Sequence, residues 1–117
     1  MNKVVEQIQA NMANENLNVE HLADLLFISR SALHRKIKNL TDMNPIDFIR
    51  LIRLKKAAEL IQDGQYSMAE ISVVIGISSP SYFSKLFQKQ FGITPKAFAV
   101  KYKGSQTQFY TEKGAHA

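Results

Sequence analysis

The sequence contains no cysteine and no long apolar run. The first absence excludes a disulfide framework and a thiolate metal site, and it suits a reducing compartment. The second excludes a membrane-spanning helix, and the N-terminus lacks the basic start and hydrophobic stretch of a signal peptide. We therefore expect a cytoplasmic protein that makes no membrane contact through this segment.

Acidic residues are missing from two long stretches. None occurs between Arg30 and Leu40 and none between Ile71 and Thr111, although the chain of 117 residues has 10 of them and a net charge of +5. These stretches hold nine of its cations: Arg30, Arg35, Lys36, Lys38, Lys85, Lys89, Lys96, Lys101 and Lys103. A positive field concentrated in this way points to an anionic partner.

Catalytic groups are scarce as well. The three histidines, His21, His34 and His116, are scattered, and no pair of acidic residues shares an apolar pocket pattern. His34 is the best candidate for acid-base chemistry, but its neighbours on the expected helix face are basic. The sequence therefore predicts no enzyme, no cofactor and no metal site.

The stretch from Ser79 to Pro95 predicts one helix with a clear start, a clear end and two faces. Ser79 can cap it, Pro80 suits the first helical position, and Gly92 ends it. Its buried face is predicted by apolar residues at helical spacing, Phe83, Leu86, Phe87 and Phe91. The opposite face has no acid and would suit a DNA major groove, with Ser81, Ser84, Lys85, Gln88 and Lys89. Taken alone, it would also suit an ordinary solvated surface.

The same pattern occurs twice. A shift of fifty residues places Ser31, Arg35 and Pro45 on Ser81, Lys85 and Pro95. Each copy has a helix, a short turn and a second, outer helix, so the sequence predicts a tandem pair of helix-turn-helix units. In the first outer helix, residues 30–40, we predict that Leu33, Ile37 and Leu40 point inward. The predicted outward residues are Ser31, His34, Arg35 and Lys38.

The predicted fold class is all-α, with two helix-turn-helix lobes, a long linker helix between them and about seven helices. We expect a first lobe over residues 1–44, the linker over 45–63, a second lobe over 64–102 and a flexible tail over 103–117. The linker is apolar on nearly every side, so it should be buried and pack into both lobes. We expect its Arg50 and Arg53 on the surface or in salt bridges.

From Asn18 to Tyr102 the chain resembles the AraC/XylS-type transcription regulators. The resemblance is densest in SMAEISVVIGISSPSYFSKLFQKQFGITPKAF, and SRSALHRKIKNLTDMNPIDFIRLIRLKKAAELI is similar to the first unit and linker of that family. It implies a seven-helix domain that sets one helix of each lobe into neighbouring major grooves. The base-reading positions it implies are Ser31, His34, Arg35 and Lys38 in the first lobe, and Pro80, Ser81, Ser84, Lys85 and Gln88 in the second. Phosphate contacts are expected at Ser29, Arg30, Ser79, Lys89 and Thr94.

Two residues depart from the repeat pattern. Phe27 stands where the second copy has glycine, so the first turn is expected either to be more open or to bury the ring. Asp42 stands where the other copy has Gly92, although Asp tolerates the left-handed conformation better than most residues.

The function predicted is sequence-specific binding of double-stranded DNA for transcription regulation. The alternative is a protein-interaction adaptor built on helix-turn-helix units, with weak non-specific DNA affinity. RNA polymerase is the expected additional partner. The family usually couples this unit to a sensor or receiver domain, and the first repeat is similar to units of two-component regulators and hybrid sensor kinases. Either a short, stand-alone monomeric regulator or the DNA-binding end of a longer protein would fit, and we expect the second. It would be located at the nucleoid or at the cytoplasmic end of a membrane protein.

Overall fold

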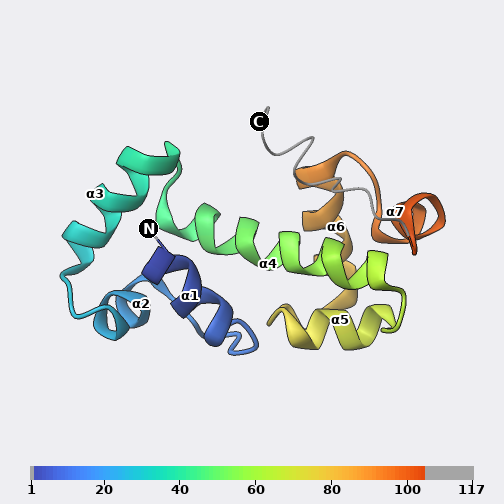
Figure 1. Ribbon diagram of the computed structural model, residues 1–117, viewed down its shortest axis with the longest axis horizontal. Coiled ribbons are helices and arrows are strands. Elements are labelled where there is room, and N and C mark those ends of the chain that lie inside the picture. The colour runs from blue at the N-terminus through green and yellow to red at the C-terminus, as the bar shows by residue number, and fades with distance from the viewer. Residues whose placement is uncertain (1, 105–117) are drawn as a thin grey trace. The chain divides into compact units, whose positions relative to one another are not determined.

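Seven helices and no strand form the part of the chain that the computed structural model describes, residues 2–104 (Figure 1). They are α1 (Asn2–Ala10), α2 (Val19–Leu25), α3 (Arg30–Thr41), α4 (Pro45–Asp63), α5 (Met68–Val74), α6 (Pro80–Phe91) and α7 (Pro95–Tyr102). The all-α prediction is confirmed. The chain divides into two compact units, and the boundary falls between Arg53 and Leu54, inside α4.

Side-chain caps set where most of the helices begin. In each case an oxygen of the cap residue accepts a backbone N–H three residues ahead, which satisfies a donor that the first turn leaves unpaired. The Asn18 cap of α2 accepts from His21 at 2.8 Å, and the Ser29 cap of α3 accepts from Ala32 at 3.0 Å. The same geometry recurs at Ser67, Ser79 and Thr94. The predicted starts of these helices are confirmed.

The core of the first unit is built from α1, α2, α3 and the first half of α4. It includes Ile8, Leu22, Leu33, Ile37 and Phe48. The prediction that Leu40 points inward is wrong, because its side chain is 60% exposed. Leu40 has the right angular position, but it lies in the last turn of α3, which extends away from α1 and α2 (Figure 1). Periodicity predicts a face, but it does not predict how far the core reaches along it.

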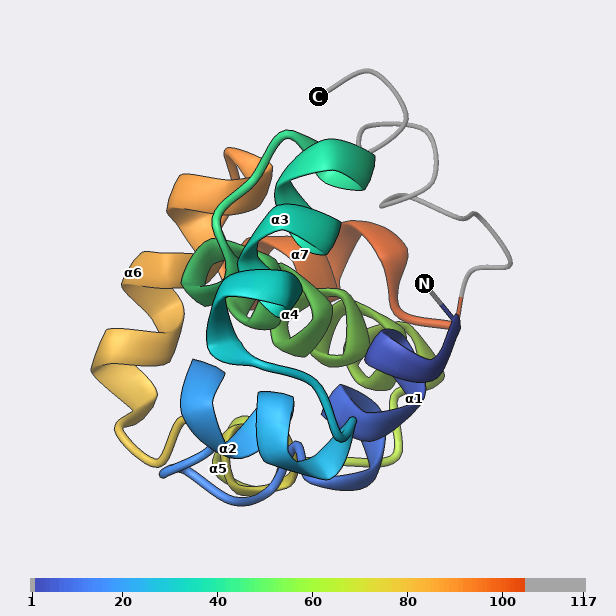
Figure 2. The ribbon, with the colours of Figure 1, turned by 90° about the vertical axis from the view of Figure 1, so that its left-hand side faces the viewer.

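The turn between α2 and α3 is neither more open nor wrapped around a buried ring. Phe27 adopts the left-handed conformation, φ 58°, as Gly76 does in the second copy, φ 78°. The hydrogen bonds of the two turns also correspond: Phe27 N–H donates to Asp24 O and Gly76 N–H to Val73 O, both at 3.1 Å. The ring of Phe27 is 95% exposed. This turn can be followed between α2 and α3 in Figure 2.

Asp42 ends α3 in the same way that Gly92 ends α6. Both residues are left-handed, with φ of 61° and 76°. Their N–H groups donate to Lys38 O and Gln88 O at 2.8 and 2.7 Å. The expectation that Asp would accept this conformation is confirmed.

A cluster of aromatic rings fills the second unit. Phe87 is fully buried and meets Phe83, Phe91 and Phe98 edge-on, at centroid distances of 5.8, 4.7 and 5.4 Å. Such edge-to-face pairs stabilise a core beyond the area they bury. The face predicted for α6 is therefore confirmed.

The end of α7 returns to the end of α4. Gly104 N–H donates to Gln62 O at 2.6 Å, and Lys103 N–H donates to Ala99 O at 3.0 Å. These are the first two residues of the predicted tail. The rest of that tail, residues 105–117, lies outside the described residues, and so does His116.

Helix α4 is buried along most of its length, as its apolar composition predicts. Phe48 and Ile49 belong to the core of the first unit, and Leu54, Ala57 and Ile61 are buried on the second-unit side of the boundary. Ile46, in the first turn, is an exception and is 60% exposed.

The two arginines of α4 differ from each other. Arg50 is partly exposed and pairs with Asp47 at 3.6 Å, as expected. Arg53 was expected on the surface or in a salt bridge, but it is only 9% exposed and its Nη2 donates to Asn14 O at 2.7 Å. Burial lowers the pKa of the Arg53 guanidinium, and the negative charge of Glu15 partly opposes that shift. Arg53 therefore ties α4 to the loop between α1 and α2.

Candidate nucleic-acid interface

Helix α3 presents an outer face without acidic residues. Leu33 and Ile37 are fully buried, so the helical spacing turns Ser31, His34 and Arg35 to the exposed side. These three predicted positions thus lie together on one face. Lys38 is also exposed, but its Nζ lies 3.3 Å from Asp42 O and 4.0 Å from Asp42 Oδ1. It interacts with the end of its own helix, which a cation there stabilises.

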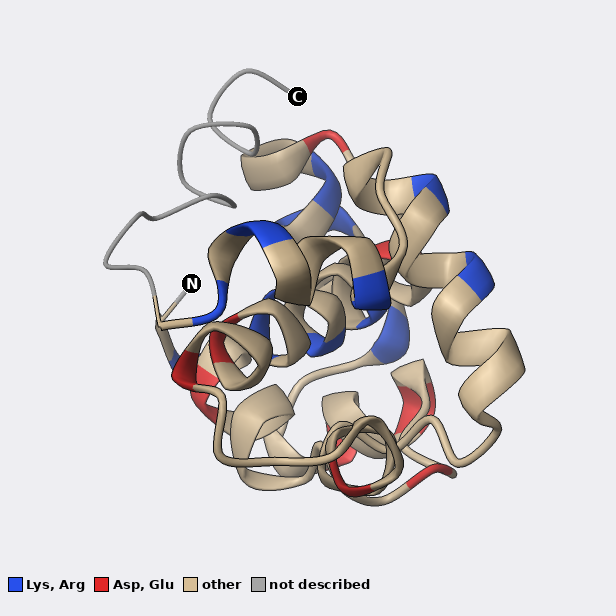
Figure 3. Cartoon of the chain, turned by 90° about the vertical axis from the view of Figure 1, so that its right-hand side faces the viewer, with Lys and Arg blue, Asp and Glu red and all other residues tan. Residues whose placement is uncertain are grey.

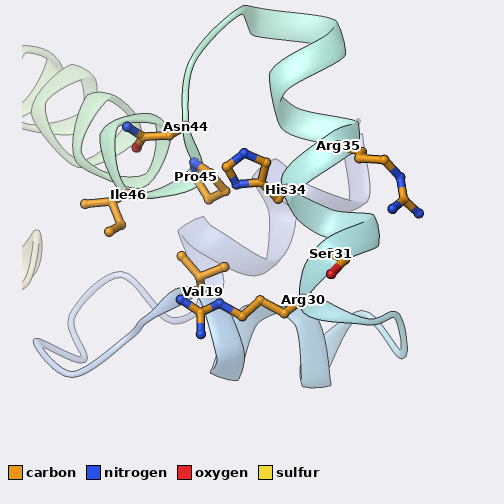
Figure 4. Close-up of a pocket in the computed structure, with 8 residues that line it drawn as sticks. All are labelled: Val19, Arg30, Ser31, His34, Arg35, Asn44, Pro45 and Ile46. Atoms are coloured by element: carbon orange, nitrogen blue, oxygen red, sulfur yellow. The ribbon is translucent and has the colours of Figure 1, made fainter.

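A groove of about 490 Å³ follows one side of α3. Its lining comes from α3, from the first residue of α2 and from the start of α4: Val19, Arg30, Ser31, His34, Arg35, Asn44, Pro45 and Ile46. In Figure 4, the ring of His34 points toward Pro45 and Arg30 reaches toward Val19, whereas the guanidinium end of Arg35 extends away from the other lining residues. Helix α3 can thus offer the cation of Arg35 to a surface in front of the helix and the cation of Arg30 inside the groove.

Helix α6 presents the equivalent face in the second unit. Pro80, Ser81, Lys85, Gln88 and Lys89 are exposed, and Ser84 is half-buried. Figure 3 shows lysine on α6 and no acidic residue. Pro80 has no N–H to donate, and the Ser81 hydroxyl lies 3.4 Å from the hydroxyl of Ser79. The two lysines and Gln88 are therefore the long hydrogen-bonding side chains of this face.

Four of the five candidate phosphate contacts, Ser29, Arg30, Ser79 and Thr94, lie at helix starts, whereas Lys89 lies in the last turn of α6. The hydroxyls of Ser29, Ser79 and Thr94 each accept a backbone N–H of their own helix, from Ala32, Tyr82 and Ala97. The hydroxyls of these caps are thus engaged within the helix. The backbone N–H groups of the first turn that remain point toward the position that an anion takes at a helix start. Ser29 and Arg30 adjoin Ser31 at the start of α3, and Ser79 adjoins Ser81 at the start of α6.

Residues 22–100 match the family described as Helix-turn-helix domain. The chain belongs to the AraC-type helix-turn-helix domains. The family resemblance drawn from the sequence is confirmed. An AraC-type domain is a DNA-binding domain of transcription regulators.

Relatives of this AraC-type domain include parts of much longer proteins. Histidine kinase P4 of Formosa agariphila is 40% identical over 102 residues, which cover 87% of this chain and 7% of the kinase. The HTH-type transcriptional activator CsvR of Escherichia coli is 37% identical over 83 residues, 71% of this chain and 31% of the activator. The chain thus spans less than a third of the length of these two relatives.

A solved structure has the same fold. The C-terminal domain of AraT, a response regulator from Geobacillus stearothermophilus, superposes with a TM-score of 0.79 at 28% identity, over 90% of this chain and 87% of that one. A histidine kinase and a response regulator are thus among the proteins that this AraC-type domain is similar to.

Sequence reasoning did not place Val19, Asn44 and Ile46 beside the outer face of α3. They come from the starts of α2 and α4, and the spacing rules of one helix say nothing about residues on another. The start of α4 at Asn44 and Pro45 was predicted, but the groove it forms with α3 was not.

No helix in the described residues is long and apolar enough to cross a membrane. Nor do residues 2–104 hold a group of His, Asp and Glu that could bind a metal ion.

Proposed function

We propose that α3 and α6 of this AraC-type domain enter successive major grooves of double-stranded DNA and read its sequence. The observation that carries the proposal is the pair of exposed, acid-free helix faces, each opposite a fully buried apolar face: Leu33 and Ile37 in α3, Phe83 and Phe87 in α6. Major grooves on one side of B-DNA recur about every 34 Å, so the site should contain two short blocks about one helical turn apart.

Base reading in the first lobe centres on Arg35. Its guanidinium can donate two parallel hydrogen bonds to the O6 and N7 atoms of guanine, a pair worth about 1–3 kcal/mol of discrimination. His34 and Ser31 can bond to bases or phosphates from the same face, and Lys38 can do so when it leaves the end of its helix. Arg35 is the best placed of the four because its side chain extends outward (Figure 4).

The second lobe relies more on lysine, glutamine and phosphates. Lys85 and Gln88 are its long exposed donors, whereas Pro80 offers no N–H and Ser84 is half-buried. Ser81 can add a short hydroxyl contact. We therefore assign base contacts in this lobe chiefly to Lys85 and Gln88.

Phosphate contacts fix the register without reading sequence. In the first lobe we assign them to Ser29 and Arg30 at the start of α3. In the second lobe they fall to Ser79, Lys89 and Thr94. The N–H groups of a first helical turn and a nearby cation together form an anion site.

The proposal extends to the full-length protein and its partners. We infer that the domain is the cytoplasmic output end of a longer regulator with a sensor or receiver domain, because 87% of it aligns with 7% of a histidine kinase. RNA polymerase is the further partner that we propose. Catalysis has no part in this function, since an AraC-type domain acts by binding.

The test is selection of binding sites from random duplexes, followed by affinity measurements as salt is raised. We expect two enriched blocks and a log-log salt slope of about −0.9 per phosphate contacted. Arg35→Ala and Lys85→Ala should each weaken binding to the selected site by about 1–3 kcal/mol, and binding to random DNA much less. Lys56→Ala is the matched control, because this cation lies on α4 and pairs with Glu59 at 3.7 Å.

Other outcomes would change the assignment. Equal losses on selected and random DNA would make Arg35 and Lys85 phosphate contacts. One enriched block would mean that one lobe reads sequence and the other clamps the backbone. If no duplex is enriched and salt abolishes weak binding, the proposal fails and the adaptor function takes its place.

A further inference from the structure

Phe27 has a conformation that a residue with a side chain rarely adopts. Its φ of 58° is in the left-handed region, where a bulky L-residue is disfavoured. Gly76 makes the corresponding turn of the second copy with the same pattern of hydrogen bonds. Glycine would therefore make the first turn as well, and at a lower conformational cost. The turn itself does not explain the aromatic ring.

The core does not explain the ring either. It is 95% exposed, the highest value among the large exposed hydrophobic residues that the structure describes, while the neighbouring Leu26 and Ile28 pack against the core of the first unit. The chain thus holds a strained backbone at this position and leaves a large apolar surface in water. Strain kept without a gain in packing is a recurrent feature of functional positions.

The position of Phe27 joins it to the proposed DNA face. It lies two residues before Ser29, the cap of α3, and three before Arg30, both of which are exposed. The edge of a duplex offers chemistry of this mixed kind, because phosphates lie beside apolar deoxyribose carbons and beside the 5-methyl groups of thymine in the major groove. The exposed ring of Phe27 lies near Arg30 and the start of α3 in the chain, so this end of α3 offers an apolar surface and a phosphate-binding group together, as that edge requires.

We propose that Phe27 is a DNA-contacting residue, which extends the face of α3 by apolar contact with the duplex. This inference rests on the proposed function, since it uses the same helix and the same ligand. The contact is to a thymine methyl group or to a deoxyribose of the bound strand, which are the two apolar surfaces within this edge. The second lobe, with Gly76 at this position, makes no such contact.

The test uses two variants of the full chain, Phe27→Gly and Phe27→Asn. Both remove the ring and both suit the left-handed conformation, but only glycine also loosens the backbone. We expect each to bind the selected duplex about tenfold more weakly, in fluorescence anisotropy, with an unchanged or higher melting temperature. Val100→Ala, which truncates an 85% exposed side chain on α7, should bind like wild type.

Replacing thymine by deoxyuridine in the site separates the two apolar surfaces. If the ring contacts a methyl group, one such replacement weakens wild-type binding by about fourfold and leaves the Phe27 variants unaffected. If deoxyuridine has no effect while both variants lose affinity, the contact is to deoxyribose. Either result supports the inference.

Two results would overturn it. One is that both variants bind the selected duplex as tightly as wild type, which would leave the ring for a protein partner. The other is that only the glycine variant weakens binding, which would make backbone rigidity the cause. In both cases wild type still selects a duplex, so the proposed function stands. If wild type selects no duplex at all, the proposed function and this inference fail together.

Discussion

Phe87 holds the buried face of α6 against the core of the second unit, and replacing it by leucine tests that arrangement. The residue is fully buried and contacts three other rings edge-on, with interplanar angles of 72°, 63° and 80°. Leucine keeps most of the apolar volume but cannot make these contacts. Phe87→Leu therefore isolates the aromatic geometry from burial as such.

The magnitude follows from the number of contacts. Each edge-to-face pair contributes about 0.5–1.5 kcal/mol beyond its area, so three pairs predict a loss of about 2–4 kcal/mol. A small domain is stabilised by about 5–15 kcal/mol, so this is a large fraction of the total. At about 4 °C per kcal/mol for a domain of this size, the melting temperature should fall by about 8–16 °C.

Thermal unfolding followed by circular dichroism at 222 nm gives the melting temperature, and amide hydrogen exchange locates the loss. Protection should decrease in α6 and α7, where the four rings lie. Tyr82→Leu is the matched control, because Tyr82 is on the same helix but 50% exposed, and it should cost less than about 0.5 kcal/mol. If Phe87→Leu melts at the temperature of the Tyr82 variant, the aromatic cluster does not hold α6 in place.

Two further predictions concern helix positions that carry buried or capping polar groups. In urea denaturation, the free energy of unfolding of Arg53→Met should stay within about 1 kcal/mol of wild type, because the lost hydrogen bond to Asn14 is offset by no longer burying a charge. Arg53→Ala should lose about 2 kcal/mol more, because it also leaves a cavity. An equal loss in both variants would show that the hydrogen bond itself matters. Glu70 accepts the Ser67 backbone N–H at 2.9 Å, and this bond, followed by one to the Ser67 side chain, lowers the pKa of Glu70 below its usual 4.5. A carboxyl with a lowered folded-state pKa stabilises the fold above pH 4.5 and loses that contribution as the pH falls through the lowered value. The stability difference between wild type and Glu70→Ala should therefore shrink in acid, and a constant difference would mean that the charge has no role.

The helix starts were predictable because capping is local. Asn18, Ser29, Ser79 and Thr94 each lie at the boundary that the sequence predicts, since a cap oxygen reaches only the N–H groups of its own first turn. Periodicity likewise predicts which face of a helix is buried wherever another element packs along it, as for α6. The tandem repeat predicted two helix-turn-helix units and the outer helix of each, and the motifs within the repeat indicated the family.

The tertiary structure decided what lies beyond one helix. Leu40 and Ile46 have apolar side chains but are exposed, because no element within residues 2–104 covers the end of α3 or the start of α4 at those positions. Arg53 is charged but buried, because the loop at Asn14 brings a carbonyl within hydrogen-bonding distance.

The candidate interface divides in the same way. That α3 and α6 have outward faces without acids was determined by the sequence, because helical spacing and residue type are enough to define a face. The groove beside α3 and the exposure of the Phe27 ring were decided by the tertiary structure. Each depends on where separate elements meet in space, and the free energy that places them comes from packing between residues distant in the chain.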